Sequence, residues 1–384
     1  MDGIAVESEG AYTRYRSKFR NMTRQHNIMA LVGNGFDIQV LRALGSKMDT
    51  TYMSFYHFLK SRKFDSDNLI FRVMEEEKQA GSTAWSDIEA AIERLLKGQQ
   101  DVSAIEKSLQ DIQFEFSEFL DVVVTPNLLA RLSQLVVEGG KTDRSLSGFL
   151  RDVRDEDRYG KMSLLQRMDI GDLLNFRFVN FNYTALLDNF VFLDKAQFDP
   201  KPFVTSDRNF NFEPNPHGFD HRIGLKKRWM VSYLLTEVVH PHGMQYTPRS
   251  ILFGVDSGHK GDAIRLEKPY WAQNEVIHRA YFSDTHLFII FGCSLGRSDR
   301  WWWKQIADAL LSAPPLDNPA GLPPDLIIYW RIEGQELTAD QILDRFAQAS
   351  GYGGDLDFWK VLKDRAYVVR YRDDDDRVWL SPSS

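Results

Sequence analysis

The sequence lacks the features that mark secreted, membrane-spanning and strongly basic proteins. It has one cysteine, Cys293, so it can form no internal disulfide and no cysteine-rich zinc site. No apolar run reaches the roughly 18 residues of a membrane span. The start, MDGIAVESEG, has no basic segment followed by an apolar core, and therefore does not resemble a signal peptide. The net charge of −7 argues against nucleic acid as the main partner. Together these absences predict a cytoplasmic protein that does not bind membranes.

What the sequence does contain is typical of a large globular α/β protein. It has 384 residues, of which 43% are hydrophobic and 26% are charged. Apolar segments predict strands at 28–33, 176–182, 237–243, 250–257, 286–294, 325–330 and 366–371. Helical periodicity is predicted between the later strands, at 274–282, 300–312 and 339–350. This alternation indicates βαβ units and a doubly wound, mostly parallel sheet of the Rossmann type.

A long helical block interrupts the predicted strands. Between residues 48 and 172 the apolar residues recur at helical spacing, and Ile88, Ile92 and Leu95 fall on one face. We therefore predict one α/β domain over residues 1–384 that carries a helical insertion at 48–172. The segment 191–232 is rich in Pro, Asn, Asp and aromatic residues, and is predicted to be a long loop or subdomain over the sheet.

Small and polar residues follow five of the predicted strands. Ligands of open α/β sheets bind at the carboxyl ends of the strands, so these residues are candidates for a nucleotide site. They are Gly33, Asn34, Gly35, Phe36 and Asp37 after the first strand, Asn182, Tyr183 and Thr184 after the second, His242 after the third, Gly254 and Asp256 in the fourth, and Gly292, Ser294, Leu295, Ser298 and Asp299 after the fifth.

Two of these loops have alternative interpretations. GNGFD lacks the third glycine of the dinucleotide fingerprint, since Ile38 stands there, and a tight turn would explain it equally well. In the second loop, SLGRSD, Ser298 or Asp299 could cap the following helix. The tryptophans at 301–303 in that helix are more typical of core or interface packing than of base stacking.

Histidines raise the question of metal chemistry. His240 and His242 lie two residues apart, and His217 and His221 lie four apart. Together they could form the metal site of a metal-dependent nuclease or phosphoesterase, but no acidic residue stands at a familiar ligand spacing. A single general base, His242, is favoured over a metal site because the following glycine leaves space beside its imidazole. A buried structural histidine is the remaining alternative.

The motifs as a set resemble a known family. LVGNGFD, WSDIE, FVNFNYT, HPHG, ILFGVDS and IIFGCSLGRSDRWWW occur in this order over about residues 28–310. This pattern resembles the AbiH family of bacterial abortive-infection proteins, which act against bacteriophage. One departure follows GNGFD, where the family usually has Gly-Leu-Pro-Thr and this chain lacks the proline.

The AbiH pattern is in turn similar to the sirtuin-like NAD-binding fold. By that resemblance Gly33 and Gly35 hold the diphosphate, Asn182 contacts the ribose or a water, and His242 is the base. Gly292, Ser294 and Leu295 would line the adenosine side. Sirtuins carry a four-cysteine zinc module that this chain cannot form, so we do not expect it to deacylate proteins, and the resemblance implies hydrolysis of NAD instead. No metal or further cofactor is expected, because the leaving group, nicotinamide, is neutral.

The same resemblance implies how such an enzyme is controlled. An NAD hydrolase that harms its host must be restrained until infection, so we expect a homo-oligomer and a phage-derived trigger or a defence-system partner. Trp301–Trp303 and the segment 191–232 are the candidate contact surfaces. The other alternative is a non-catalytic subunit that senses nucleotides within a defence complex.

Overall fold

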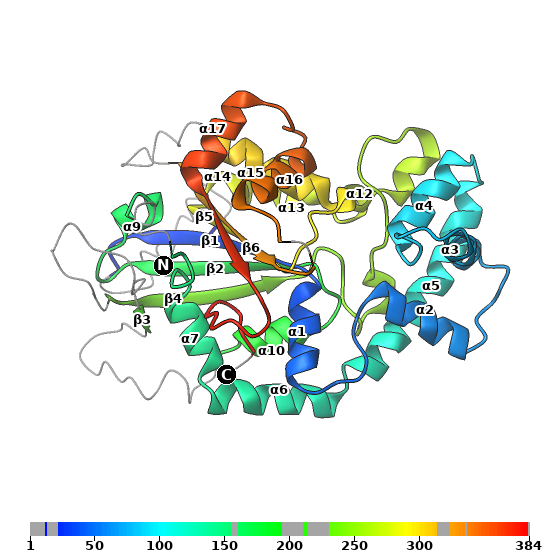
Figure 1. Cartoon of the computed structure of the whole chain (residues 1–384), viewed down its shortest axis with the longest axis horizontal. Coiled ribbons are helices and arrows are strands. Elements are labelled where there is room, and N and C mark those ends of the chain that lie inside the picture. Colours follow the sequence, from blue (N-terminus) through cyan, green and yellow to red (C-terminus); the bar gives the residue numbers. More distant parts are fainter. Residues whose placement is uncertain are drawn as a thin grey trace, which may run out of the picture.

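The protein is built on one seven-stranded sheet (Figure 1). The computed structural model describes residues 12–13, 22–154, 160–193, 210–212, 230–312, 323–334 and 336–382. The strands follow the order β3-β4-β2-β1-β5-β6-β7, and every neighbouring pair is parallel except β3 with β4. Their bounds are β1 Gln25–Val32, β2 Leu173–Asn180, β3 Phe210–Phe212, β4 Met230–Val239, β5 Leu287–Phe291, β6 Asp325–Arg331 and β7 Ala366–Tyr371. The predicted fold class, a mostly parallel α/β sheet, is confirmed.

Helices cover both faces of the sheet, which explains why its central strands are apolar throughout. In β1, Ile28 and Ala30 belong to one buried cluster, whereas Met29 and Leu31 belong to the other. The first cluster includes residues of α1 (Gly35–Ala43), α7 (Lys141–Ser147) and α10 (Leu186–Val191). The second includes residues of α15 (Arg300–Leu311), α16 (Ala339–Ser350) and α17 (Leu356–Arg365).

The order of the strands fixes where a ligand crevice can form. From β1 the chain moves outward through β2 to β4, and it then returns to the other side of β1 to form β5. In sheets of this kind, ligands bind where the direction of winding reverses, beyond the carboxyl ends of the strands. Here that point lies between β1 and β5.

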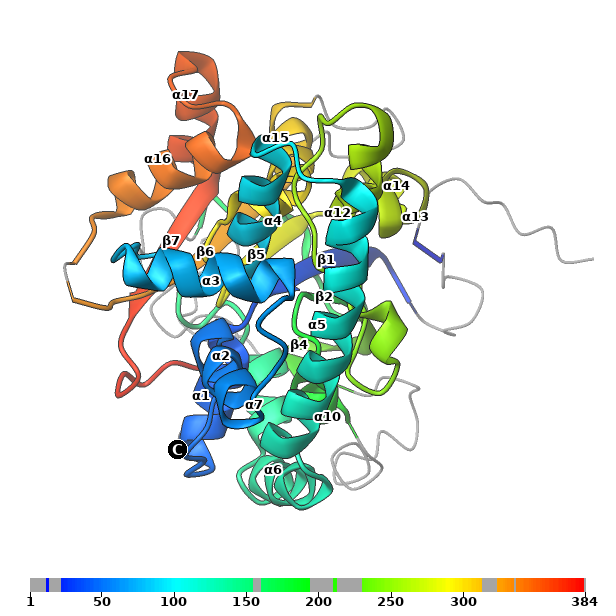
Figure 2. The same ribbon diagram turned by 90° about the vertical axis from the view of Figure 1, so that its right-hand side faces the viewer.

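Helices of the long block between β1 and β2 lie beyond these carboxyl ends. Figures 1 and 2 show α2 to α5 grouped at this end of the sheet. The ring of Phe116 on α5 lies 5.2 Å from that of Tyr183 and 5.1 Å from that of Phe253, so aromatic packing joins the block to the strand ends. These four helices are α2 Tyr52–Ser61, α3 Leu69–Gln79, α4 Ile88–Lys97 and α5 Val102–Val123. The block continues through α6 Pro126–Glu138 to α9 Ser163–Arg167, which lies at the amino end of β1, where Arg24 Nη1 donates to Arg167 O at 2.9 Å.

No single helix of the described residues is long and apolar enough to cross a membrane. The helices α5 and α6 meet the length and composition test only when taken together, and the chain bends by 52° between them.

Two predictions about strands are wrong. Residues 250–257 form no strand, apart from an isolated bridge between Val255 and Glu267. The buried side chains of Ile251 and Phe253 belong instead to the core cluster that contains Phe116 of α5, so their alternation reflects packing against a helix. The third predicted strand, 237–243, ends earlier, because β4 stops at Val239 and leaves His242 in a turn.

Short helices connect this turn to β5 and to α15. They are η1 Pro248–Ser250, η2 Gly261–Leu266, α12 Lys268–Trp271, α13 Asn274–Ile277, α14 Arg279–Ser283 and η3 Arg297–Asp299. The predicted helix at 274–282 is therefore two short helices, α13 and α14, whereas α16 occupies the predicted residues 339–350.

Candidate functional site

A cleft of about 930 Å³ opens at the carboxyl ends of β1, β2 and β5. Its walls come from the strand ends on one side and from α2, α4 and α5 of the helical block on the other. The volume falls within the range of about 300–1,000 Å³ that is usual for ligand pockets. Predicted site residues that line it are Gly33, Asn34, Gly35, Asp37, Asn182, Tyr183, Thr184, His242, Asp256, Gly292, Ser294, Ser298 and Asp299.

Three predicted site residues do not line the cleft. Phe36 is fully buried against Phe190, 5.4 Å between ring centroids. Leu295 belongs to the buried cluster beneath α15, and Gly254 faces the Leu266 carbonyl, which a Cβ on Gly254 would approach to 2.5 Å. These three positions are explained by packing alone.

The two glycine-containing loops pack directly on each other. A Cβ on Gly33 would lie 2.7 Å from the Gly292 carbonyl oxygen, and one on Gly35 would lie 2.8 Å from the Gly292 Cα. Positive φ is found at Gly292 (+67°) and not at Gly35. The amides of Gly35 and Phe36 donate to Gly292 O and Gly33 O, so these first amides of α1 are not free for a phosphate. The glycines are thus required for the contact between the loops, and the predicted phosphate cradle is largely closed.

Polar side chains at the ends of β1 and β2 form a closed network. Asp37 is fully buried and accepts hydrogen bonds from Asn182 Nδ2 at 2.9 Å and from Thr184 Oγ1 at 2.6 Å. Asn182 Nδ2 also donates to Gly33 O at 3.2 Å. Both hydrogens of this amide are therefore used within the protein, and only Asn182 Oδ1 can serve a ligand, as an acceptor. Burial raises the pKa of Asp37 to about 7.

His242 faces an aspartate across the cleft floor. Its Nε2 lies 3.4 Å from Asp299 Oδ1, and its ring stacks on Phe181 at 5.0 Å. Asp299 stands at the N-cap position of α15, but its side chain caps nothing there. Within the described part of the chain its buried Oδ1 accepts no hydrogen bond. Burial, helped by the positive charge of Lys268, holds the pKa of His242 well below its usual range, so its imidazole is neutral.

A buried lysine connects this pair to the helical block. Lys268 Nζ lies 2.8 Å from Glu89 Oε1 and 3.7 Å from Asp299 Oδ1, and the side chains of Lys268 and Glu89 are only 6% and 12% exposed. Burial opposes the charged form of Lys268, but Asp299 and Glu89 outweigh it and hold its pKa well above the usual range. Tyr52 Oη donates to the same Glu89 oxygen at 3.0 Å.

The sequence interpretation did not assign Lys268, Glu89, Tyr52 or Asp87 to the site. All four line the cleft, and Asp87 caps α4 through a 3.0 Å hydrogen bond to the Ala90 amide. Burial, with Glu89 nearby, raises the pKa of Asp87 to about 6. A signal for two of them was present, since Asp87 and Glu89 belong to the WSDIE segment of the resemblance. Nothing comparable marked Lys268 or Tyr52.

The histidines that the structure describes are not gathered as a metal site. β4 ends at Val239, so His240 and His242 do not share a strand face; His242 lines the cleft, and His240, which does not, has its Nε2 3.1 Å from Asp188 Oδ1. Among the described residues no group of three or more His, Cys, Asp or Glu side chains could hold a metal ion. His217 and His221 lie outside the described residues.

The tryptophans predicted as an oligomer surface are buried. Trp301, Trp302 and Trp303 belong to the core cluster between α15 and the sheet. Trp301 Nε1 donates to Glu275 Oε1 at 2.7 Å, and Trp303 Nε1 donates to Gly296 O at 3.0 Å. They therefore hold α15 and the SLGRSD loop in place and offer no surface to a second copy.

Comparison with known proteins identifies the family. The family model described as bacteriophage abortive infection AbiH matches residues 29–314, from β1 to the end of α15. A search of curated proteins and a search of solved structures each gave no match to the chain. The match covers well over half of the 384 residues, and its span contains every residue described above as lining the cleft. The chain therefore belongs to the AbiH family of bacteriophage abortive infection proteins.

Proposed function

We propose that the cleft binds NAD and hydrolyses it to nicotinamide and ADP-ribose, as the effector step of abortive infection. The observation that carries the proposal is the pair formed by the buried His242 and the partly exposed Asp299 in a ligand-sized cleft at the switch point of a parallel sheet. Family membership supports the role in defence, and the sirtuin-like resemblance of the motif order supports NAD as the nucleotide.

The reaction needs little from the protein. The bond between nicotinamide and ribose breaks to give neutral nicotinamide and a cationic ribosyl centre, so no acid is needed for the leaving group. Asp299 and Glu89 share one cation, Lys268, so this cluster of three charged side chains carries a net negative charge that stabilises positive charge on the ribose as it develops. Water then adds to the ribosyl carbon and loses one proton, which yields ADP-ribose.

His242 is the group that takes this proton. Because its pKa is held low, the imidazole is neutral and can accept a proton near neutral pH. A weak base is sufficient, since water bonded to a ribosyl cation is strongly acidic. Asn182 Oδ1 accepts a hydrogen bond from the same water, and the Asp299 carboxylate, whose side chain is 20% exposed, accepts one from a ribose hydroxyl.

The diphosphate lies against the β5–α15 loop in this proposal. The first amides of α1 are used internally, whereas Arg297, Ser298 and Arg300 all line the cleft. Arginine is well suited to bind phosphate oxygens through two parallel hydrogen bonds. Binding of the diphosphate, which the sequence assigned to Gly33 and Gly35, is thus assigned to side chains of the SLGRSD loop and to the adjacent Arg300.

The decisive experiment is incubation of the purified protein with NAD, followed by detection of nicotinamide and ADP-ribose. His242→Ala is expected to lower the cleavage rate by about 10² to 10⁴ and to leave NAD affinity within a few-fold, since a general base acts mainly in the transition state. The matched control is His240→Ala, which removes an imidazole two residues away that does not line the cleft.

The outcomes separate the competing interpretations. If His240→Ala is inactive and His242→Ala is active, the assignment of the base is wrong. Bound NAD without turnover would favour a nucleotide sensor. Loss of activity with EDTA and recovery with zinc or manganese would favour the metal-dependent alternative. Light scattering at micromolar concentration tests the expected self-association, for which a surface other than Trp301–Trp303 is required.

A further inference from the structure

A second cavity of about 780 Å³ lies behind the turn that carries His242. It is lined by α5, by Arg177 of β2, by residues 239–253 and by residues between η2 and His278. Figure 2 shows α5 beside α12 and α13. Its volume also falls within the usual range for ligand pockets of about 300–1,000 Å³. No step of the proposed reaction uses it.

The lining of this second cavity is positively charged although the chain as a whole carries −7. Three arginines, Arg177, Arg249 and Arg265, line it against one acid, Glu106, which pairs with Arg265 at 2.6 Å. The Arg177 side chain is only 6% exposed, whereas its partner Glu237 is 57% exposed and does not line the cavity. Arg249 makes no hydrogen bond or ion pair with the part of the chain that the structure describes. The cavity therefore favours an anion.

Aromatic surface completes the cavity. The Trp271 ring is 54% exposed, and its Nε1 donates to Arg265 O, which fixes the ring at the rim. Its apolar neighbours in the lining, Leu109, Phe253 and Leu266, are buried core residues. A fixed indole beside arginines matches a ligand that has a flat ring at one end and phosphate at the other, because bases stack on aromatic side chains.

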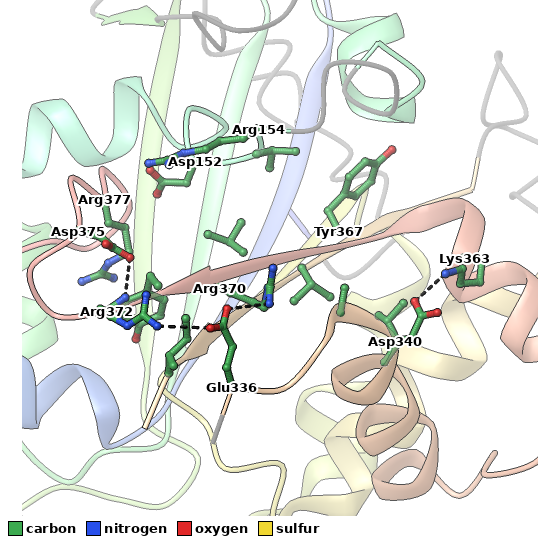
Figure 3. Close-up of a pocket in the computed structure, with 17 residues that line it drawn as sticks. Asp152, Arg154, Glu336, Asp340, Lys363, Tyr367, Arg370, Arg372, Asp375 and Arg377 are labelled. Carbon is green, nitrogen blue, oxygen red and sulfur yellow. Dashed lines mark hydrogen bonds and ion pairs between the residues drawn. The ribbon is translucent and has the colours of Figure 1, made fainter. Parts of the chain in front are cut away.

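The cavity along β7 provides a contrast (Figure 3). It is smaller, about 430 Å³, and it is also lined by several basic residues. There, however, Lys363 pairs with Asp340 at 2.6 Å, and Arg370 and Arg372 pair with Glu336 at 2.9 and 3.4 Å. Three of its five cations are thus paired with acids that share the lining, and its four acids nearly balance its five cations. In the second cavity, Arg177 and Arg249 have no acid of the lining as a partner, so the excess of positive charge there is larger.

One thin wall separates the second cavity from the cleft. His240, Pro241 and Gly243 face the second cavity, whereas His242 faces the cleft. The wall is held together by the bond from Leu252 N to His242 O at 2.8 Å. Gly243 has φ of +83°, and a Cβ there would lie 1.9 Å from Ser250 O, so the turn cannot accommodate any side chain at this position. A ligand in the second cavity would contact the backbone on both sides of His242.

We propose that the second cavity is an effector site for a nucleoside phosphate, and that its occupancy changes the environment of His242 through the shared wall. The phosphates contact Arg249, with Arg177 beneath them, and the base stacks on Trp271. Binding at this site does not depend on NAD being the substrate of the cleft, so the two proposals can fail separately.

The test is calorimetric titration of the full chain with ATP. Separate titrations with adenosine and with inorganic phosphate measure the contributions of the nucleoside and of the phosphate groups. Arg249→Ala should weaken ATP binding about tenfold or more, the loss expected for a charge-assisted contact, and should leave adenosine unchanged. Trp271→Ala should weaken both ATP and adenosine. Arg279→Ala is the control, because this arginine is exposed on α14 and outside the lining.

A second measurement addresses the coupling. The His242 imidazole resonance, assigned by its absence in His242→Gln, should shift when ATP binds to the wild type and should not shift in the Arg249→Ala, Trp271→Ala double variant. The inference is overturned if the wild type binds no ATP at millimolar concentration, or if both variants bind it normally while Arg297→Ala in the cleft loses it. An unchanged resonance with ATP bound would disprove the coupling.

Discussion

The two walls of the cleft differ in how their polar groups are satisfied. On the sheet side, Asp37, Asn182 and Thr184 bond to one another within the carboxyl ends of two adjacent elements. On the side of the helical block, Glu89 pairs with Lys268, which comes from a different part of the chain. The polar groups of the sheet wall are therefore satisfied by residues of that wall. The ion pair of the other wall requires contact between α4 and α12.

This difference suggests a division of roles. The hydrogen bonds of Asp37 join only residues that directly follow β1 and β2, whereas the Glu89–Lys268 ion pair joins two regions and is lost when the regions separate. Lys268 also lies beside Asp299 and lowers the pKa of His242, so the state of the Glu89–Lys268 contact reaches the proposed base. The helical block thus forms one wall of the cleft and, through Glu89, also contributes to the electrostatics of the cleft.

The largest effect is expected at the contact between the regions. Lys268→Met should lower the free energy of unfolding by about 3–5 kcal/mol, because Glu89 and Asp299 then remain buried without their cation. Urea denaturation measures this. Adding Glu89→Gln should recover part of the loss, and Lys304→Met, at an exposed pair on α15, is the control. Equal losses in both lysine variants would show that the buried pair has no special role.

The stability of the sheet wall should fall when side-chain volume is added between its two glycine-containing loops. Gly35→Ala places a Cβ 2.8 Å from the Gly292 Cα, where only backbone could move away, and should cost about 1–3 kcal/mol. Gly98→Ala is the matched control, because its Cβ would meet nothing closer than 3.5 Å. Thermal unfolding of the two variants decides the matter. A Gly35→Ala protein as stable as the wild type would mean that the two loops are less closely packed than described.

The closed network should make stability depend on pH in an unusual direction. Because burial raises the pKa of Asp37 from 3.8 to about 7, the folded protein keeps a proton that the unfolded chain has already lost in this window. The stabilisation is complete below about pH 4 and is lost as the pH rises to about 7. Asp37→Asn should remove this contribution, a difference of at least about 1 kcal/mol.

Denaturation of the wild type and Asp37→Asn at about pH 5 and about pH 8 measures this contribution. The variant should gain stability relative to the wild type at the higher pH. The opposite trend would mean that Asp37 is ionised in the folded state and is stabilised there by its two donors.

The smallest effect is expected one turn along α4 from Glu89. Glu93 also lines the cleft, but its side chain is 38% exposed and pairs with Lys97 on the same helix at 2.9 Å. Glu93→Gln should change the free energy of unfolding by less than about 0.5 kcal/mol. Glu93→Gln and Glu89→Gln remove the same charge, so the difference between their effects on stability reflects the difference in burial. A larger loss of stability at Glu93 would mean that Glu93, and not Glu89, holds this wall in place.

The sequence predicted the sheet wall well, for physical reasons. Central strands of a parallel sheet are buried on both faces, so they appear as apolar runs, and the residues after them must gather at one edge. Gly33, Asn182 and Gly292 could be brought together on that basis alone. Their contacts could not be predicted, because whether a glycine admits a ligand or another loop depends on what packs against it.

The other wall was missed because it depends on tertiary packing. Lys268 follows a segment, 250–257, whose alternating apolar residues predicted a strand, whereas Phe253 packs against Phe116 of α5. Once that segment is a packed loop, Lys268 turns inward and meets Glu89. No local pattern distinguishes a lysine that will be buried against a glutamate 179 residues earlier in the chain from one that faces solvent.

The pairing of β5 with β6 has a practical consequence for expression. The family match ends at residue 314, but β6 and β7 come later and complete the sheet beyond β5. The C-terminal segment also returns to α1, where Arg377 Nη2 donates to Gln39 Oε1 at 2.6 Å. A chain cut at the family boundary would expose the unpaired edge of β5, with its run LFIIF, to other molecules. Such a fragment is expected to aggregate, so recombinant work on this protein requires the strands that lie beyond the recognisable family sequence.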